Sequence, residues 1–296
     1  TKQPFVLIMQ DKWMLNMCTR FSKNNAWAID STFKTNVFGL PLYAAVAPNE
    51  HGVGIPLWYM LCTNDTGSQH EQFALEMTLK IIFERMEGVR PKALVIEKSW
   101  IEYRALKNVI EVDSNCWEMV NGKRQQTTCL ILLCWFHVKK AWVDHLLPKV
   151  QGMERDKLYD HMSRLMYCSK EEEFNQVYAS ILEVYKEHKN VCIYIKNCWC
   201  NDTWKKTWPK FGRMFSYGHV DTTNIVERHW QYIKYTAFKG RINRSITDLV
   251  HALIGDSVTG SWMGSTVLEW FKHKQEITDS GRFLPRANCK DEANRE

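Results

Sequence analysis

Residues 26–33 read Ala-Trp-Ala-Ile-Asp-Ser-Thr-Phe, and they decide how the rest of the chain is interpreted. Four apolar residues followed by an aspartate and two hydroxyl residues are typical of a buried strand that ends in polar side chains. An ionised carboxylate among apolar residues is costly to bury unless it is paired or bound to a metal ion. Asp30 is therefore the first candidate functional residue, and the alternative is an Asx turn at the end of the strand.

Two further apolar runs follow this strand and predict a three-stranded antiparallel meander. Residues 40–46 and 55–62 have the length and composition of strands, and the turn-rich stretch 48–52 separates them. Consecutive strands with short connections pair in antiparallel fashion. Ahead of them, residues 5–21 mix apolar and charged side chains and are expected to form a helix or an edge strand.

Beyond the meander the chain alternates helices and strands before it becomes helical. Residues 69–87 repeat apolar side chains at helical spacing, residues 92–97 read as a short strand, and Ser99 caps a helix to about residue 110. The apolar run 127–136 is typical of a central strand that is buried on both faces. Further helices are expected from residue 137 and at 153–167, 170–188, 224–238, 245–254 and 262–275.

This order of elements predicts an α/β fold, a ribonuclease H-like mixed sheet flanked by helices with an all-α insertion after the fifth strand. The 296 residues would suffice for about two domains. We expect one catalytic fold instead, because the helix after the insertion must return to the sheet. The expected segments are an N-terminal segment (1–25), the first part of the core (26–142), the helical insertion (143–221), the return helices of the core (222–256) and a C-terminal helix and tail (257–296).

Two more carboxylates are expected to join Asp30. Glu97 ends the fourth strand, which neighbours the first strand in this fold, and Glu227 opens the helix that follows the insertion. Three such carboxylates can hold two Mg²⁺ ions, or Mn²⁺ in their place, which activate a water or a 3′-hydroxyl and stabilise the leaving oxygen. Taken singly, Glu97 also fits a solvated strand end, and Glu227 fits a capping box with Asn224. The triple is the stronger interpretation because the fold order brings its members together.

The cysteines and the apolar runs exclude other classes of protein. Ten cysteines without regular spacing indicate reduced thiols rather than a disulfide framework. The tight pair Cys198 and Cys200 lacks two further ligands nearby, so no zinc site is predicted. The longest apolar run, 129–136, is far shorter than the roughly 20 residues of a membrane span. No signal peptide is recognised, and Thr1 suggests an excised or processed fragment.

The net charge of +6 is concentrated in one segment. Residues 196–246 hold ten Lys or Arg and three acidic residues, so this stretch alone carries +7. Its cations alternate with Trp and Tyr, which suits a polyanion because cations meet phosphates and aromatic rings stack on bases. The alternative is a solvated helical face with aromatic residues in the core. The expected DNA contacts are Lys205, Lys206, Lys210, Arg213, Lys234, Arg241 and Arg244.

Four short motifs carry a family resemblance. They are IDSTFKTN (29–36), VIEK (95–98), CWFHVKK (134–140) and TNIVE (223–227). Together and in this order they resemble the catalytic core of Mutator-like (MULE) transposases. The resemblance runs from about residue 26 to 253. It implies a DDE-type transposase with a ribonuclease H-like fold and Mg²⁺-dependent cutting and joining of DNA.

The resemblance also implies roles for a Cys134-x-x-His137 pair, which is similar to the family's signature after the last strand. His137 is expected beside the active site, where it contacts DNA or orients a carboxylate, and Cys134 is expected to be structural. The plainer interpretation is a buried cysteine and a histidine that starts a helix, because two ligands do not make a closed metal site.

The sequence departs from the family pattern at two site positions. The second carboxylate is normally Asp, but this chain has Glu97, whose extra methylene moves the oxygens by more than about 1 Å where catalytic geometry tolerates about 0.5 Å. Glu97 reflects natural drift in a domesticated copy or an engineered change. Trp230 stands where the family often has Asn. The zinc motifs that often accompany such cores are absent from the sequence.

Two functional hypotheses follow. The first is an active transposase whose metal ligands are Asp30, Glu97 and Glu227, with His137 beside them. The second is a domesticated, catalytically weakened or inactive DNA-binding or regulatory protein. Both have DNA as partner and a nuclear location, and the resemblance implies a homodimer or a higher synaptic assembly, because a transposase must hold two ends.

Overall fold

The computed structural model describes residues 5–22, 25–63, 69–87, 89–112, 117–120, 123–126, 129–213, 222–238, 240 and 244–254. The chain divides into two compact units, residues 1–244 and 245–296. The second unit contains α9 (Ile246–Ile254), whose Asp248 amide donates to the Ser245 hydroxyl at 3.1 Å. The helix predicted at 245–254 is therefore confirmed, and the one predicted at 262–275 lies outside the described residues.

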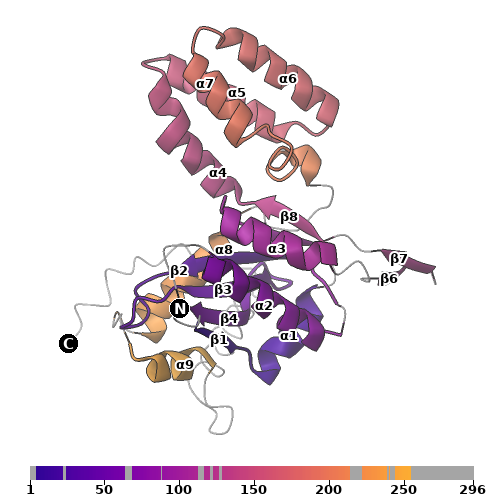
Figure 1. The fold of residues 1–296 in the computed structure, drawn as a ribbon, viewed down its shortest axis with the longest axis vertical. Coiled ribbons are helices and arrows are strands. Elements are labelled where there is room, and N and C mark those ends of the chain that lie inside the picture. Colours follow the sequence, from indigo (N-terminus) through magenta and orange to yellow (C-terminus); the bar gives the residue numbers. More distant parts are fainter. Residues whose placement is uncertain are drawn as a thin grey trace, which may run out of the picture. The chain divides into compact units, whose positions relative to one another are not determined.

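A six-stranded mixed sheet forms the centre of the first unit (Figure 1). Its strand order is β1-β4-β3-β2-β5-β8. The strands are β1 (Val6–Met9), β2 (Ala26–Thr32), β3 (Leu42–Pro48), β4 (Gly54–Cys62), β5 (Ala93–Ile96) and β8 (Leu130–Leu133). The predicted meander is confirmed, because β3 pairs antiparallel with both β2 and β4. The pairs β2–β5 and β5–β8 are parallel, as helical connections require.

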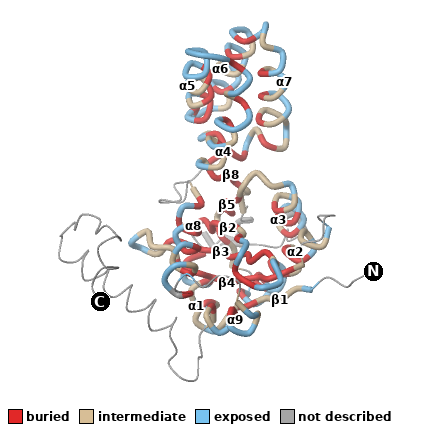
Figure 2. Tube along the Cα trace, turned by 90° about the vertical axis from the view of Figure 1, so that its left-hand side faces the viewer, coloured by how far each residue is buried: buried red, intermediate tan, exposed pale blue. Residues whose placement is uncertain are grey.

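Helices cover both faces of this sheet, as predicted. On one face lie α2 (Gln69–Arg85) and α3 (Trp100–Val112), and Trp27 of β2 contacts Phe83 of α2 with ring centroids 5.8 Å apart. Side chains alternate along a strand, so Asp30 points to the opposite face, where α8 (Asn224–Gln231) packs. The strands between these layers are buried almost throughout (Figure 2). Ser99 caps α3 as predicted, since its hydroxyl accepts from the Glu102 amide at 3.3 Å.

Two expectations from the sequence need correction or extension, and one hairpin is additional to them. Residues 127–136 are not a central strand: β8 spans four residues at the edge of the sheet, and α4 (Trp135–Ala141) begins directly after it. Leu132 and Leu133 are buried, and on the outer side of β8 a loop takes the place of a further strand, with the Leu133 amide donating to the Thr207 carbonyl at 2.8 Å. Residues 5–21 form both a strand, β1, and a helix, α1 (Lys12–Ser22). The hairpin of β6 (Trp117–Val120) and β7 (Lys123–Gln126) was not predicted.

The helical block between β8 and α8 is built around tryptophans. It comprises α4, a π-helical stretch (Trp142–Leu146), a 3-10 turn (Leu147–Lys149), α5 (Glu154–Tyr167), α6 (Glu171–Val184) and the unpredicted α7 (Lys189–Cys198). Trp142, Trp199 and Trp208 are fully buried, and their ring centroids lie 5.7–6.0 Å apart. These rings are core aromatics, so for Trp199 and Trp208 of the basic segment the alternative, aromatic residues in the core, is confirmed. After α8 the chain continues as a second π-helical stretch (Tyr232–Ala237).

Within the described residues, none of the helices combines the length and the apolar character that crossing a membrane requires.

The buried tryptophan cluster predicts where the helical block is most sensitive. Trp208 packs against two other tryptophans, and its indole Nε1 donates to the Trp199 carbonyl at 2.9 Å. Trp208→Ala should lower the free energy of unfolding by about 3–5 kcal/mol, because it leaves a large cavity. Urea denaturation measures this, with Tyr235→Ala, at an exposed site, expected to change it by less than about 0.5 kcal/mol. Equal effects of the two changes would contradict this role.

Candidate active site

The predicted carboxylates Asp30 and Glu97 come from neighbouring parallel strands. Ala28 of β2 pairs with Val95 of β5, and each acidic residue lies two positions further along its strand direction. The carboxyl ends of parallel neighbours meet at the same edge of a sheet. The pKa of Asp30 responds to the charge of Glu97, which fits this nearness.

Asp30 is the buried member of the group, with 7% of its surface exposed. Trp230 of α8 donates its indole Nε1 hydrogen to Asp30 Oδ2 at 3.1 Å. Burial raises the pKa of Asp30 to about 6, and the charge of Glu97 adds to that rise. Hydrogen bonds from the Ser31 amide and from Trp230 act in the opposite direction and favour the carboxylate. The tryptophan that departs from the family pattern thus holds the first carboxylate.

His137 joins the other two carboxylates. Its Nε2 lies 2.9 Å from Glu97 Oε1 and 3.6 Å from Glu227 Oε1. Burial alone would lower the pKa of His137, but hydrogen bonds with Cys134 and Glu97 outweigh it and raise the pKa to about 10. The hydrogen bond with His137 in turn lowers the pKa of Glu97. At neutral pH an imidazolium therefore sits between two carboxylates.

Thr223 ties this histidine to the start of α8. Its amide and its hydroxyl each donate to Cys134 Sγ at 3.2 Å. The same hydroxyl oxygen lies 3.3 Å from His137 Nδ1 and 3.4 Å from Glu227 Oε1. Burial would raise the pKa of Cys134, but hydrogen bonds from His137 and Thr223 leave it below its usual value. The cysteine and the histidine are thus linked through one buried hydroxyl.

The alternative role for Glu227 is not supported. A capping box would direct its carboxylate to the Asn224 amide, but that amide donates to the Thr222 hydroxyl at 3.4 Å. The Glu227 carboxylate faces Thr223 and His137 instead. Val226, Trp230 and Ile233, which follow one side of this helical stretch, are all in the core.

A fourth buried carboxyl, Glu102, is not among the residues that the sequence predicts for the site. It lies in the first turn of α3, is 4% exposed, and its Oε2 has no hydrogen-bond partner among the described residues. Burial raises the pKa of Glu102 well above its usual value, and the charges of Asp30 and Glu97 add to this. The sequence held no signal for it, because an acidic residue in a first helical turn is ordinary.

Residues 26–141 match the family model of the MULE transposase domain. The chain carries a MULE transposase domain. The matched range begins with β2 and ends with α4, so it includes Asp30, Glu97, Cys134 and His137, whereas Glu227 lies beyond it. A search of curated proteins finds no match.

The predicted DNA-contacting residues occupy different environments around the MULE transposase domain. Lys206 and Lys210 are exposed, and Lys205 pairs with Glu171 at 3.0 Å. The expectation is wrong for Arg213: it is buried, donates to the Leu133 carbonyl and lies 4.8 Å from the Trp135 ring centroid. Its role is structural: β8 is an edge strand, so its outward backbone groups need hydrogen-bond partners, and the Arg213 guanidinium supplies one.

Two further members of the predicted set lie near the carboxyl end of β2, and one cannot be placed. Lys234 donates to the Thr32 hydroxyl at 2.5 Å. Arg244 pairs with Asn36 through a parallel bridge, and its guanidinium lies over Phe238. Arg241 lies outside the described residues.

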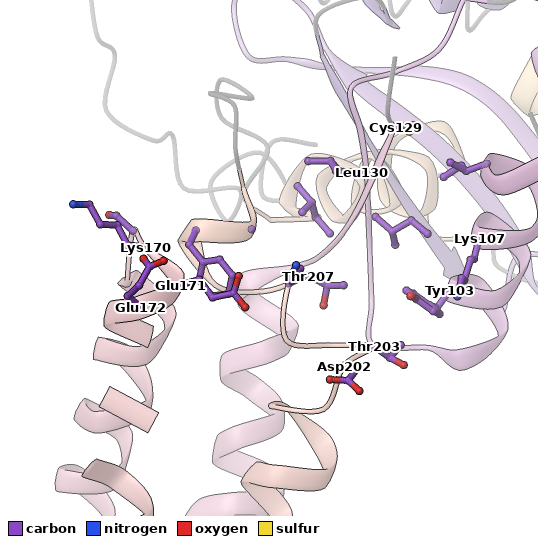
Figure 3. A pocket seen from close by; sticks show the side chains of 17 residues that line it. Tyr103, Lys107, Cys129, Leu130, Lys170, Glu171, Glu172, Asp202, Thr203 and Thr207 are labelled. Atoms are coloured by element: carbon purple, nitrogen blue, oxygen red, sulfur yellow. The ribbon is translucent and has the colours of Figure 1, made fainter. Parts of the chain in front are cut away.

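A cavity of about 700 Å³ lies at the outer edge of β8, beside the loop that contains Lys206 and Thr207 (Figure 3). Lys206 and Thr207 line it from the loop, Tyr103 and Lys107 from α3, and Leu130 from the strand. None of Asp30, Glu97, His137 and Glu227 is among its lining residues. The cavity and the carboxylate group are therefore separate features of the first unit.

The donor chemistry of the carboxylate group fits a hard divalent cation. Asp30, Glu97 and Glu227 supply carboxylate oxygens, which Mg²⁺ and Mn²⁺ prefer. In the described part of the chain, no three His, Cys, Asp or Glu side chains are grouped as a metal site would require. His137 occupies the position between Glu97 and Glu227, so cation binding requires these side chains to rearrange.

The raised pKa of Asp30 predicts a pH dependence of stability. The folded carboxyl has a pKa of about 6, whereas its usual value is 3.8, so the folded state binds the proton more tightly. Stability therefore falls as pH rises from about 4 to about 6 and stays level above that. Asp30→Asn has no carboxyl to titrate at this position. Between about pH 4 and about pH 6 the free energy of unfolding of the wild-type protein should therefore fall by about 3 kcal/mol relative to that of the variant. Urea denaturation at several pH values measures it, and parallel curves would contradict the buried carboxylate.

The position of Thr223 predicts a second effect. Thr223→Val keeps the shape but removes the hydroxyl that bonds Cys134, His137 and Glu227, which should lower the free energy of unfolding by about 1–2 kcal/mol. Thr223→Ser retains the hydroxyl and should recover most of that loss. Chemical denaturation of the three proteins tests this, and a valine variant as stable as wild type would remove Thr223 from the site.

Proposed function

We propose that this chain is the catalytic core of a DDE-type DNA transposase that cuts and joins transposon-end DNA with divalent metal ions. The observation that carries the proposal is the convergence of three carboxylates from distant parts of the chain. Asp30 lies near the carboxyl end of β2, Glu97 directly follows the parallel neighbour β5, and α8 brings Glu227 to the imidazole that also binds Glu97. The MULE transposase domain supports this class of enzyme.

The topology supports a ribonuclease H-like core. The order β4-β3-β2-β5-β8, with an antiparallel meander followed by two parallel strands, has helices on both faces. We take residues 26–142 and 222–256 as the two parts of this core and residues 143–221 as the helical insertion after the fifth core strand. The extra strand β1 extends the sheet at the opposite edge.

The chain's own residues would prepare the site for metal ions and substrate. Asp30, Glu97 and Glu227 would hold Mg²⁺ or Mn²⁺, which when bound activates a water or 3′-hydroxyl and stabilises the leaving oxygen. Trp230 fixes one oxygen of Asp30 and favours its ionised form. His137, held by Thr223, orients Glu97 and Glu227 and offsets their charge.

The alternative is a domesticated, catalytically weakened protein that keeps the fold and binds DNA. The observation that favours it is the ion pair between Glu97 and His137, which turns this longer side chain toward the imidazole. A carboxylate held there is displaced from the position that an aspartate would take. Under either hypothesis we propose DNA as the partner, a homodimer or higher assembly, and a nuclear location.

A nicking assay separates the two hypotheses. The substrate is DNA with the ends that flank this chain's coding sequence, with Mg²⁺ or Mn²⁺ and with EDTA as a blank. We expect metal-dependent nicking by the wild-type protein, up to about 100-fold faster nicking by Glu97→Asp, because small displacements of catalytic groups cost that much, and none by Asp30→Asn. Strong cleavage by Glu97→Asp alone would favour the domesticated protein. Cleavage by neither would overturn the enzyme.

The exposed lysines provide a test of the DNA surface. Lys206→Glu and Lys210→Glu should weaken binding to unrelated DNA sequences alike and flatten its salt dependence, because phosphate contacts carry no sequence information. Gel-shift titrations at several salt concentrations measure this. Lys186→Glu, at an exposed site on the far part of the helical block, is the matched control. Equal affinities for all four proteins would place the DNA elsewhere.

A further inference from the structure

The loop between β2 and β3, which follows the strand that carries Asp30, exposes three large apolar side chains. Phe33, Val37 and Phe38 have 47%, 59% and 66% of their surface exposed. Single exposed apolar residues are ordinary, but here three lie within six positions of one loop, and we call these three side chains the apolar patch. Because the loop leaves the strand that carries Asp30, the patch lies at the carboxyl end of β2.

This exposure is built into a well-ordered loop. Asn36 is buried, and its Oδ1 accepts from the Phe38 and Leu40 amides at 3.2 and 3.0 Å. Its Nδ2 donates to the Leu40 carbonyl at 2.7 Å, and the Val37 amide donates to the Arg244 carbonyl at 2.9 Å. These bonds fix the backbone, so the two phenylalanines are held out of the core rather than left loose.

The same loop shows backbone strain at Lys34. This residue has φ of +63°, a left-handed conformation that residues other than glycine seldom adopt. Such conformations persist only where the surrounding structure enforces them, and they gather at binding sites. The neighbouring Asn36 network supplies that enforcement here.

Cations accompany the apolar patch. Lys34 is exposed, and Lys234 donates to Thr32, the last residue of β2. Burial lowers the pKa of Lys234, and the charge of Lys34 lowers it further, which fits two ammonium groups on the same side of the site. Two cations beside exposed aromatic rings suit a ligand that has both phosphates and flat apolar faces.

We propose that the loop 33–40 is a base-stacking wedge, in which Phe33 and Phe38 stack on unpaired bases beside the phosphodiester while Lys34 and Lys234 contact the adjacent phosphates. The inference rests on the proposed function, since it takes DNA as the ligand, and it adds that the DNA is opened at the site. The buried tryptophans of the helical block do not serve this purpose, whereas these two phenylalanines are available to solvent.

The test compares two DNA probes on the full chain without metal. One is a short forked duplex with an unpaired 2-aminopurine at the fork, and the other is the fully paired duplex of the same sequence. We expect the wild-type protein to bind the fork about tenfold more tightly than the paired duplex, which is the gain expected from stacking one base on an aromatic ring. We also expect it to quench the fluorescence of 2-aminopurine. Phe33→Ala and Phe38→Ala should each remove most of that preference and leave binding to the paired duplex unchanged.

Three further proteins sharpen the result. Phe38→Trp should keep the preference because it retains an aromatic face, and Phe38→Leu should lose it although it stays apolar. Phe73→Ala, at an exposed position of α2, should behave as wild type. All these side chains are exposed, so circular dichroism should show the same melting temperature for every protein.

Each other outcome overturns the inference. Equal binding of fork and paired duplex by the wild-type and Phe→Ala proteins would refute the wedge and leave the proposed function standing. A change of oligomeric state in Phe38→Ala without DNA, seen by size-exclusion chromatography, would assign the patch to a second copy of the chain. A wild-type protein that binds neither probe would contradict the proposed function itself.

Discussion

The site depends on one constraint: a carboxylate, Asp30, is buried in the middle of an apolar sheet. Moving such a charge out of water costs several kcal/mol, which other parts of the chain must offset. The Trp230 indole donates to it from a position 200 residues further along the chain. Asp30 of β2 therefore keeps this hydrogen bond only if α8 returns to the sheet. The helical block between β8 and α8 must accordingly be accommodated without displacing either of them.

His137 offsets a second cost, the repulsion between the carboxylates of Glu97 and Glu227. Carboxylates close together repel one another, and an imidazolium between Glu97 and Glu227 relieves that repulsion. Thr223 and Cys134 hold the imidazole from behind, so that α4 and the start of α8 become one unit.

The sequence predicted the parts of the structure that follow from local pattern. The strand around Asp30, the meander and the capped helix after Ser99 are all signalled by neighbouring residues, and each is present. The sequence could not predict which residues that lie far apart in the chain come into contact in the fold. Arg213 reads as an exposed cation but is buried against β8, and the tryptophans among the lysines form a core. Glu102 and Thr223 likewise gain their significance only from contacts across the fold.

We infer that Asp30, Glu97 and Glu227 form a divalent-metal site, and Mn²⁺ binding tests this inference most directly. Electron paramagnetic resonance of free Mn²⁺ during titration counts the ions that the protein removes from solution. The account predicts saturable binding by the wild-type protein that Asp30→Asn abolishes, while Glu183→Gln, an exposed acid of the helical block, binds as wild type does. Equal Mn²⁺ binding by the wild-type and Asp30→Asn proteins, or no binding by either, would contradict it.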